Sequence, residues 1–424
     1  MTQNQNQTIE SIQNQNKEQS SEQRVLEIEE CLALLLEQAR EQDVITMPIE
    51  QACGMVLAET IHAEMSVPPY PKSAMDGYAV RAADLEGCSK ENPVKFKVKG
   101  QLFAGDYEEI PYEKNTAVRV MTGAFVPDGY DAVVRQEDTD YGEEEVAVYT
   151  AAKAYGNYCK EGEDIACGDV VVEKGTRLQP VHIGLLAEVG RAEIPVYRPV
   201  RVAILCTGTE LTEVGKPLQK GKIYNNISYI LAASIRQQGL QVAFQEICAD
   251  EEELLAAKLQ EALDVADIVI TTGAVSVGKR DIVPAVLQDI GAEILFRRAN
   301  IQPGTPTTGS VKNGKVILSL SGNPYAALVN FEIYFWSLLA KMMQHKSFDS
   351  VRETAVLRSD YPKTNKMRRF IRARAENGNV YLPTEVHSAS VVHNLTECNC
   401  LIDLEPGRQV QAGDEVRIIR IKGM

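Results

Sequence analysis

The chain has 424 residues, of which 44% are hydrophobic and 24% are charged, and its formal net charge is −15. The composition is typical of globular proteins, and the length predicts two to four domains. The acidic charge argues against a nucleic-acid partner, although a few local cations and backbone N–H groups suffice to bind a small anion. No apolar run approaches the roughly 20 residues that span a bilayer, and no signal peptide is recognisable, so we expect a cytoplasmic protein without a membrane partner.

The N-terminal half is expected to contain a polar tail, helices and a β-rich module. Residues 1–23 have almost no apolar side chains and are predicted to be a disordered tail. Three prolines within residues 68–71 predict an extended boundary segment. Helical spacing of apolar residues predicts helices, and short runs broken by Gly and Pro predict a small all-β module. The expected helices are 25–39, 49–63 and 181–189, and the expected strands include 94–98, 117–121 and 132–135.

From residue 201, short Val- and Ile-rich runs alternate with helix-like stretches. This alternation predicts a mainly parallel sheet with helices on both faces. Residues 304–315 are expected to form a loop or hairpin, and residues 350–424 are expected to form a small barrel or sandwich. The expected strands are 201–206, 241–248, 267–272, 293–298, 316–320, 370–375, 399–403 and 415–421, and the expected helices are 227–238, 251–265, 282–290 and 326–342.

Together these elements predict a multidomain α/β plus β protein. A small β module is inserted in its N-terminal region, and a barrel-like β domain ends the chain. The predicted parts are a tail at 1–23, a discontinuous elongated domain at 24–70 and 156–199, an inserted β domain at 71–155, an α/β domain at 200–347 and a C-terminal β domain at 348–424.

Three polar, Gly-bearing turns are expected at the carboxyl ends of the parallel strands, where open α/β sheets bind ligands. They are residues 207–210, 273–281 and 321–324. Glycines there allow a close approach of the ligand, and free N–H groups at the following helix suit phosphate. Each turn alone fits an ordinary connection, but three turns at one edge favour a binding site.

Carboxylates near that edge suit a divalent metal such as Mg²⁺ that bridges protein and phosphate. Asp250 could instead cap the following helix, and Asp164 could lie in a solvated turn. Four arginines within residues 368–374 could clamp an oxyanion or form a solvated strand face. The residues alone therefore predict a site for a nucleotide or pterin phosphate with a metal. The candidate carboxylates are Asp76, Asp164, Glu210, Asp250 and Asp281.

Specific motifs extend this interpretation. Residues 68–80, Pro-Pro-Tyr-Pro-Lys-Ser-Ala-Met-Asp-Gly-Tyr-Ala-Val, closely resemble the signature of molybdopterin molybdenumtransferases, the MoeA family that includes the gephyrin E domain. Further segments follow in that family's order and approximate spacing, so the resemblance covers about residue 25 to the end. These segments are 121–124, 132–137, 161–165, 207–211, 273–281, 302–306, 321–324, 369, 387–388, 397–401 and 412–414.

The resemblance implies a homodimer that inserts molybdenum from molybdate into adenylylated molybdopterin and releases AMP, with Mg²⁺ or another divalent cation. Its active cleft would combine the molybdopterin-binding α/β domain of one subunit with the first half of the other. Contacts with a molybdopterin adenylyltransferase or a molybdoenzyme chaperone are further expectations. The implied catalytic residues are Asp76, Thr122, Asp164, Glu210, Asp250 and Asp281, with Glu210 and Asp281 as metal ligands. The implied substrate-binding residues are Ser73, Met75, Thr207, Gly208, Gly273, Ser276, Gly278, Arg298, Gln302, Gly304, Thr305, Gly322, Asn323 and Pro324.

The chain departs from the family pattern in the half of the predicted site that would bind anions. Ala274 replaces the second Gly of a Gly-Gly pair, Gln302 and Thr305 replace two lysines, and Ser321 replaces a proline, whereas Arg298 keeps one basic position. The lost cations favour an alternative, a divergent paralogue that binds pterin nucleotide or a partner protein without efficient metal insertion, or that prefers tungstate. The α/β part alone also resembles molybdopterin adenylyltransferases and a pyridine-nucleotide deamidase family.

Overall fold

The computed structural model describes residues 24–275, 282–383 and 391–422. The chain divides into two compact units. Unit 1 comprises Met1–Ile45, Gly54–Val56 and Tyr197–Met424, and unit 2 comprises Thr46–Cys53 and Leu57–Val196. The finer boundaries of four domains stay a prediction. Among the helices of the described residues, none has both the length and the apolar character needed to cross a membrane.

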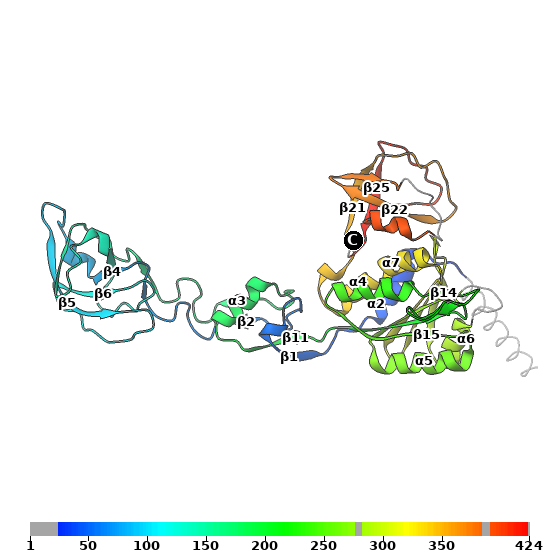
Figure 1. The fold of residues 1–424 in the computed structure, drawn as a ribbon, viewed down its shortest axis with the longest axis horizontal. Coiled ribbons are helices and arrows are strands. Elements are labelled where there is room, and N and C mark those ends of the chain that lie inside the picture. Colours follow the sequence, from blue (N-terminus) through cyan, green and yellow to red (C-terminus); the bar gives the residue numbers. More distant parts are fainter. Residues whose placement is uncertain (1–23, 276–281, 384–390, 423–424) are drawn as a thin grey trace, which may run out of the picture. The chain divides into compact units, whose positions relative to one another are not determined.

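The centre of unit 1 is a six-stranded sheet in the order β15-β12-β16-β20-β19-β17. Its edge strand β15 is labelled in Figure 1. The first four of these strands run parallel, and β19 is antiparallel to both of its neighbours. The predicted hairpin is formed by β19 and β20, with Asn313 and Gly314 at positive φ in its two-residue turn. The mainly parallel sheet is therefore confirmed. Its strands are β12 (Arg201–Thr207), β15 (Gln241–Cys248), β16 (Ile268–Thr272), β17 (Glu293–Arg298), β19 (Pro306–Lys312) and β20 (Lys315–Leu320).

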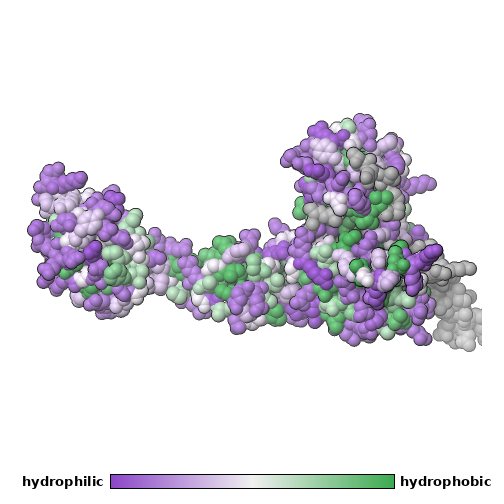
Figure 2. All heavy atoms as spheres, in the orientation of Figure 1, coloured by the Kyte–Doolittle hydropathy of each residue, from purple (hydrophilic) through white to green (hydrophobic). Residues whose placement is uncertain are grey.

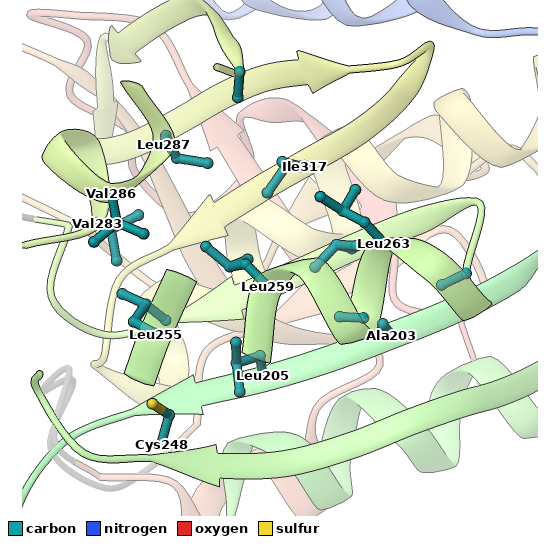
Figure 3. Packing of buried hydrophobic residues seen from close by; sticks show 14 of the residues in the cluster. Ala203, Leu205, Cys248, Leu255, Leu259, Leu263, Val283, Val286, Leu287 and Ile317 are labelled. Carbon is teal, nitrogen blue, oxygen red and sulfur yellow. The ribbon is translucent and has the colours of Figure 1, made fainter. Parts of the chain in front are cut away.

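Helices cover both faces of this sheet. Helices α5 and α6 pack together on one face, where Leu255, Leu259 and Leu287 are buried with Leu205 and Ile317 of the strands (Figure 3). Helix α7 packs against α2 and α4 on the other face, and nearly all of its residues are buried. The helices of unit 1 are α2 (Ile28–Gln38), α4 (Ile227–Gln237), α5 (Glu252–Val265), α6 (Val283–Asp289) and α7 (Pro324–Met342), with 3-10 turns η4 (Lys346–Phe348) and η5 (His393–Glu397).

The C-terminal strands close into a barrel, as expected. The order is β22-β23-β21-β25-β24, and β24 pairs back to β22. The short strand β18 (Ile301–Gln302) adds to β22 in parallel and aligns Gln302 with Arg369. The barrel strands are β21 (Arg352–Leu357), β22 (Arg368–Glu376), β23 (Asn379–Tyr381), β24 (Cys400–Leu404) and β25 (Glu415–Arg420).

Two of the arginines on β22, Arg368 and Arg372, are buried, so the alternative of a solvated strand face is wrong for them. Arg368 forms ion pairs with Asp403 (2.6 Å) and Glu29. The Arg372 guanidinium lies 3.7 Å from the centre of the Tyr325 ring. A buried charge is tolerated only when it is paired and hydrogen-bonded, and these contacts attach β22 to α2 and α7.

Unit 2 contains the predicted small β module, a five-stranded sheet in the order β7-β4-β6-β5-β8. A Cβ atom on Gly77 would lie 1.9 Å from the Val134 carbonyl oxygen, so only glycine lets β4 approach β7. The module strands are β4 (Gly77–Val80), β5 (Val94–Leu102), β6 (Thr116–Val120), β7 (Ala132–Arg135) and β8 (Glu145–Val148), with 3-10 turns η2 (Ala82–Leu85) and η3 (Gln136–Asp138). The remaining elements are β1 (Val44–Pro48), η1 (Ile49–Gln51), β2 (Ile61–His62), β3 (Lys72–Ser73), β9 (Tyr158–Cys159), β10 (Val170–Val172), α3 (Pro180–Glu188) and β11 (Glu193–Tyr197).

The helix predicted over residues 49–63 is wrong. Only η1 is helical there, and Gly54 follows at φ 87°. The N–H groups of Leu57, Ala58 and Ala63 donate to the carbonyl oxygens of Thr176, Pro195 and Asp169, far along the chain. These long-range partners replace the i−4 carbonyl that a helix would use, and they bury the same apolar residues whose spacing suggested a helix.

On the face shown in Figure 2, hydrophilic residues cover most of the surface and hydrophobic ones form scattered groups.

Candidate active site

The three Gly-bearing turns of unit 1 meet at the carboxyl ends of β12, β16 and β20. The Gly273 N–H donates to the Leu320 carbonyl oxygen at 3.1 Å. A Cβ atom on Gly273 would lie 2.2 Å from the Thr207 carbonyl oxygen, and one on Gly322 would lie 3.3 Å from the Gly273 Cα. The turns pack so tightly that only hydrogen fits at Gly273. The connection after β12 leads to β15 on one side, and the connection after β16 leads toward β17 on the other side. The boundary between β12 and β16 is therefore a switch point, where such sheets bind ligands.

Two carboxylates flank the first turn. Asp250 Oδ2 accepts from the Thr209 N–H at 3.1 Å, and its buried Oδ1 has no hydrogen-bond partner among the described residues. The carboxylate of Glu210 folds over Gly208, where a Cβ atom would lie 2.8 Å from Glu210 Oε2. Glu251, and not Asp250, is the N-cap residue of α5, so the alternative role for Asp250 as a helix cap is wrong. Asp250 instead holds the turn that presents Glu210.

The first turn contains a buried threonine, Thr207, and the last turn contains an asparagine that caps α7, Asn323. Thr207 is buried, and its Oγ1 also lacks a hydrogen-bond partner among the residues that the structure describes. Asn323 Oδ1 accepts from the Ala326 N–H at 3.1 Å and so caps α7, with Pro324 in the first turn of the helix. Ser321, which stands where the family has proline, accepts from the Asn323 N–H through its Oγ at 3.3 Å. The turn therefore keeps a fixed shape without that proline.

Residues 302–306 are fixed to α7. Asn330 Nδ2 donates to the Gly304 carbonyl oxygen at 3.0 Å, and a Cβ atom on Gly304 would lie 2.0 Å from that nitrogen. The Thr305 hydroxyl donates to the Ile301 carbonyl oxygen at 2.6 Å, so it is used within its own turn. Gln302 is exposed and neutral. These two residues therefore present no cation at this position.

Two arginines supply positive charge beside this segment. Within the described parts of the chain, the side chain of Arg298 makes no hydrogen bond or ion pair. Arg369 is one of the four arginines whose sequence offered an oxyanion clamp as one alternative, and its alignment with Gln302 in a parallel pairing puts both side chains on the same face. Its guanidinium donates to Asn365 Oδ1 at 2.7 Å and lies 5.7 Å from the centre of the Tyr361 ring. Sequence alternation along β22 separates Arg369 from Arg368 and Arg372, but the pairing with β18 is a tertiary feature.

In unit 2, Asp76 and Thr122 come together at the ends of β4 and β6. Asp76 Oδ1 accepts from both the N–H and the Oγ1 hydroxyl of Thr122, each at 2.7 Å. These two hydrogen bonds lower the pKa of Asp76 below its usual value. Nearby, the Ser73 hydroxyl donates to the Met75 carbonyl oxygen at 2.5 Å, and the Met75 side chain is exposed. The carboxylate is therefore held at Oδ1, and its lowered pKa favours the ionised form.

Asp164 lies in a loop beside the proline-rich segment of unit 2. Its N–H donates to the Val67 carbonyl oxygen at 3.0 Å, and the Gly162 N–H donates to the Pro68 carbonyl oxygen at the same distance. The residue itself is exposed, as in the solvated turn that its neighbours suggest. The fold thus attaches Asp164 to the segment that leads to Asp76.

The described residues contain only part of the predicted site for a divalent metal. Residues 24–275, 282–383 and 391–422 contain no group of three or more His, Cys, Asp or Glu side chains arranged to hold a metal ion. Glu210 and Asp250 alone fall short of such a site. The predicted residues Ser276, Gly278 and Asp281 lie outside the described residues.

Ala274 occupies a backbone conformation that favours glycine, with φ at 50°. We expect Ala274→Gly to raise the free energy of unfolding of unit 1 by about 0.5–1 kcal/mol, because a Cβ atom is unfavourable in the left-handed region. Urea denaturation checks this expectation. Ala256→Gly, in the interior of α5, is the matched control and should lower stability by about 1 kcal/mol. An equal loss of unfolding free energy in both variants would show that the backbone at Ala274 is not strained.

The chain matches three family models in succession. Residues 26–190 match the MoeA N-terminal region (domain I and II), and residues 203–341 match a probable molybdopterin binding domain. Residues 354–421 match the MoeA C-terminal region (domain IV). The similarity therefore extends over both units.

Curated relatives and solved structures agree with these matches. The molybdopterin molybdenumtransferase of Staphylococcus epidermidis is 35% identical over 398 residues, which cover 93% of this chain and 95% of the relative. The Bacillus subtilis protein of the same name is 37% identical, covering 88% of this chain and 89% of the relative. The crystal structure of the molybdopterin biosynthesis MoeA protein from Pyrococcus horikoshii has a TM-score of 0.85 at 29% identity, covering 95% of this chain and all of that chain.

Proposed function

The chain belongs to the MoeA family of molybdopterin molybdenumtransferases, and from this premise we propose that it transfers molybdenum from molybdate to adenylylated molybdopterin with release of AMP. The observation that carries this proposal is the continuous similarity to curated transferases on both sides of the α/β domain. An adenylyltransferase or a deamidase that shares only the α/β part would not account for the flanking regions. The relatives also favour the transferase over a divergent binding protein.

The proposed chemistry assigns different tasks to the two carboxylate groups. In unit 2, Asp76 is fixed by Thr122 and offers Oδ2 as a proton acceptor or as a hydrogen-bond acceptor for a reacting water. In unit 1, Glu210 and Asp250 flank the turn after β12, where N–H groups suit a phosphate. The role of Asp164 is proposed from the family position alone.

The anions in the reaction need cations, because both molybdate and the phosphates of the substrate are negatively charged. Arg298 and Arg369 are the arginines beside residues 302–306, and we assign them to the oxyanion. Their positive charge supports the proposed activity despite the replacement of two lysines by Gln302 and Thr305. Arginine is suited to this task because its planar group donates two parallel hydrogen bonds to an oxyanion.

A divalent cation, with Glu210 and Asp281 as ligands, remains part of the proposal. The Oδ1 of Asp250, which is buried and without a hydrogen-bond partner among the described residues, supports a third oxygen donor near the same turn. Such a cation, when bound, would neutralise phosphate charge. Since the described carboxylates alone do not form a complete site, the steps assigned above depend on no metal.

AMP release from adenylylated molybdopterin tests the function directly. The purified protein is incubated with molybdate or with tungstate, each with and without Mg²⁺, and AMP is quantified by chromatography. Release that requires an oxyanion supports the transferase, and the faster arm identifies the preferred oxyanion. No release above the blank in any arm, from folded protein, would overturn the proposal.

Placing lysines at positions 302 and 305 should strengthen binding of the oxyanion. In a Gln302→Lys, Thr305→Lys double variant we expect the KM for molybdate to fall about three- to tenfold, because two cations join Arg298 and Arg369. Initial rates over a molybdate series measure this change. Gln302→Glu is the matched control and should raise the KM. An unchanged KM in both variants would place the oxyanion elsewhere.

The remaining expectations stay proposals from the family resemblance. They are a homodimer, a cytoplasmic location, and contacts with a molybdopterin adenylyltransferase or a molybdoenzyme chaperone. Analytical ultracentrifugation tests the first of these, and a monomer at micromolar concentration would remove it.

A further inference from the structure

Aromatic side chains are exposed beside the Asp76–Thr122 pair of unit 2. The Tyr70 and Tyr107 rings both contact the Phe125 ring, with centres 5.9 Å and 5.0 Å away, and these three residues are called the aromatic cluster. Phe125 is buried, whereas Tyr107 is 69% exposed and Tyr70 is 37% exposed. Apolar side chains that gather on a surface in this way are typical of binding sites.

The loop after β6, which begins at Thr122, attaches the aromatic cluster to the proposed reaction site; β6 and its neighbour β5 are labelled in Figure 1. Phe125 is three residues beyond Thr122. The Gly123 N–H donates to the Ser73 carbonyl oxygen at 2.8 Å, and the Ser73 N–H donates to the Ala124 carbonyl oxygen at 2.9 Å. The loop is therefore fixed to the segment that leads to the aspartate of the site.

A hydrogen-bonded turn after β5 presents Tyr107. The Asp106 N–H donates to the Phe103 carbonyl oxygen at 3.0 Å, and the Phe103 N–H donates to Asp106 Oδ2 at 2.9 Å. A Cβ atom on Gly123 would lie 3.5 Å from the Ala104 Cβ, so this turn packs against the loop after β6. Because its backbone is already ordered, the turn loses little conformational freedom when a ligand contacts Tyr107.

Carboxylates surround the exposed ring of Tyr107. Residues 106–109, Asp-Tyr-Glu-Glu, contain three carboxylates and no cation. The Tyr107 hydroxyl donates to Glu109 Oε1 at 3.1 Å, and this hydrogen bond raises the pKa of Tyr107. The charge of Asp128 acts on Tyr107 in the same direction. Such a rim repels phosphate and oxyanions and favours a neutral ligand with N–H donors.

We propose that the aromatic cluster binds the pterin ring of the substrate, with Tyr107 stacked on the ring and Glu109 accepting from its N–H groups. A pterin is a neutral, planar heterocycle, and its amino group lies beside a ring N–H, so the two donors suit one carboxylate. Aromatic side chains stack on flat heterocycles of this kind. The substrate carries phosphate at its other end, which the acidic rim keeps away from Tyr107.

The inference rests on the proposed function and deepens it, because it names residues that orient the substrate in unit 2. The ring is stacked at one side of the loop that begins at Thr122, and Asp76 is hydrogen-bonded to the start of the same loop. Tyr107 is therefore a positioning residue, and its removal should weaken binding of the substrate more than it slows the reaction.

Titration of the full chain into pterin, followed by pterin fluorescence, tests the assignment, and lumazine, with an oxo group in place of the amino group, is the comparison probe. We expect Tyr107→Ser to raise the Kd of both probes about tenfold, because the stacking ring is lost. Glu109→Gln should raise the Kd of pterin severalfold and leave that of lumazine unchanged. Tyr381→Ser, which removes an exposed tyrosine of unit 1, is the matched control and should bind both probes like the parent.

Activity measurements separate this inference from the function on which it rests. The KM for adenylylated molybdopterin should rise about tenfold in Tyr107→Ser with kcat within twofold, and Tyr107→Phe should restore it because the ring is kept. If the parent releases AMP but binds no pterin, or if Tyr107→Ser and Glu109→Gln bind and react like the parent, the inference is wrong and the function stands. If the parent releases no AMP yet binds pterin in a manner that depends on Tyr107, the function fails and the pterin site stands.

Discussion

AMP release from adenylylated molybdopterin should fall between about a hundredfold and ten-thousandfold in Asp76→Ala. The reason is the geometry around this carboxylate. Thr122 donates two hydrogen bonds to one oxygen, at 2.7 Å each, and these bonds lower the pKa of Asp76. The group therefore stays ionised at neutral pH and keeps its second oxygen for the reaction. Single-turnover rates at saturating molybdate measure the loss.

Substitutions around Asp76 distinguish its chemistry from general damage. Asp128→Ala, which removes an exposed carboxylate of the same unit, should react like the parent. Thr122→Val keeps the N–H donor and loses the hydroxyl, so a loss of about tenfold is expected, and Thr122→Ser should recover most of it. Asp76→Ala with more than a tenth of the parent rate would contradict the assigned role.

The stability of unit 1 should decrease as the pH rises from about 4.5 to about 8, because of Glu332. This residue of α7 is fully buried, and burial raises the pKa of its carboxyl to about 8. Its Oε2 accepts from Trp336 Nε1 at 3.0 Å and from the Lys422 N–H at 3.2 Å, which offsets part of the rise. Its Oε1 is buried and has no hydrogen-bond partner among the described residues. The environment therefore disfavours the ionised form.

The direction of this pH effect follows from proton linkage. Below pH 4.5 both the folded and unfolded states hold the proton, and the full stability is present. Between pH 4.5 and 8 only the folded state holds it, so the free energy of unfolding falls as the pH rises, by a total on the order of 5 kcal/mol. Above pH 8 Glu332 is ionised in both states, and its contribution to the free energy of unfolding has been lost.

Urea denaturation followed by tryptophan fluorescence measures this effect in unit 1, since Trp336 is the single tryptophan of the chain and contacts Glu332. Glu332→Gln should remove most of the pH dependence and be more stable than the parent at pH 8.5. Glu293→Gln, on an exposed position of β17, should keep the parent's dependence. If the free energy of unfolding depended on pH in the same way in the parent and in Glu332→Gln, the Glu332 proton would not be linked to folding.

Much of the architecture was determined by local sequence patterns. Alternating strand and helix signals predicted the parallel sheet, and the bounds of β15 and β17 match the expected runs at 241–248 and 293–298. Buried parallel strands are continuous apolar runs, and glycine at their ends is needed where turns touch, as Gly273 does. The motif at residues 68–80 identified the family, because such a run is specific by itself.

Tertiary structure decided the partners of individual groups. Residues 49–63 have helical spacing but pair with distant segments, because their N–H groups find carbonyl oxygens across unit 2. Arg368 and Arg369 are adjacent in sequence, yet one forms a buried ion pair with Asp403 and the other lies beside Gln302. A hydrogen bond or an ion pair depends on the distance between two groups, and residues far apart in the chain acquire that distance only when the chain folds.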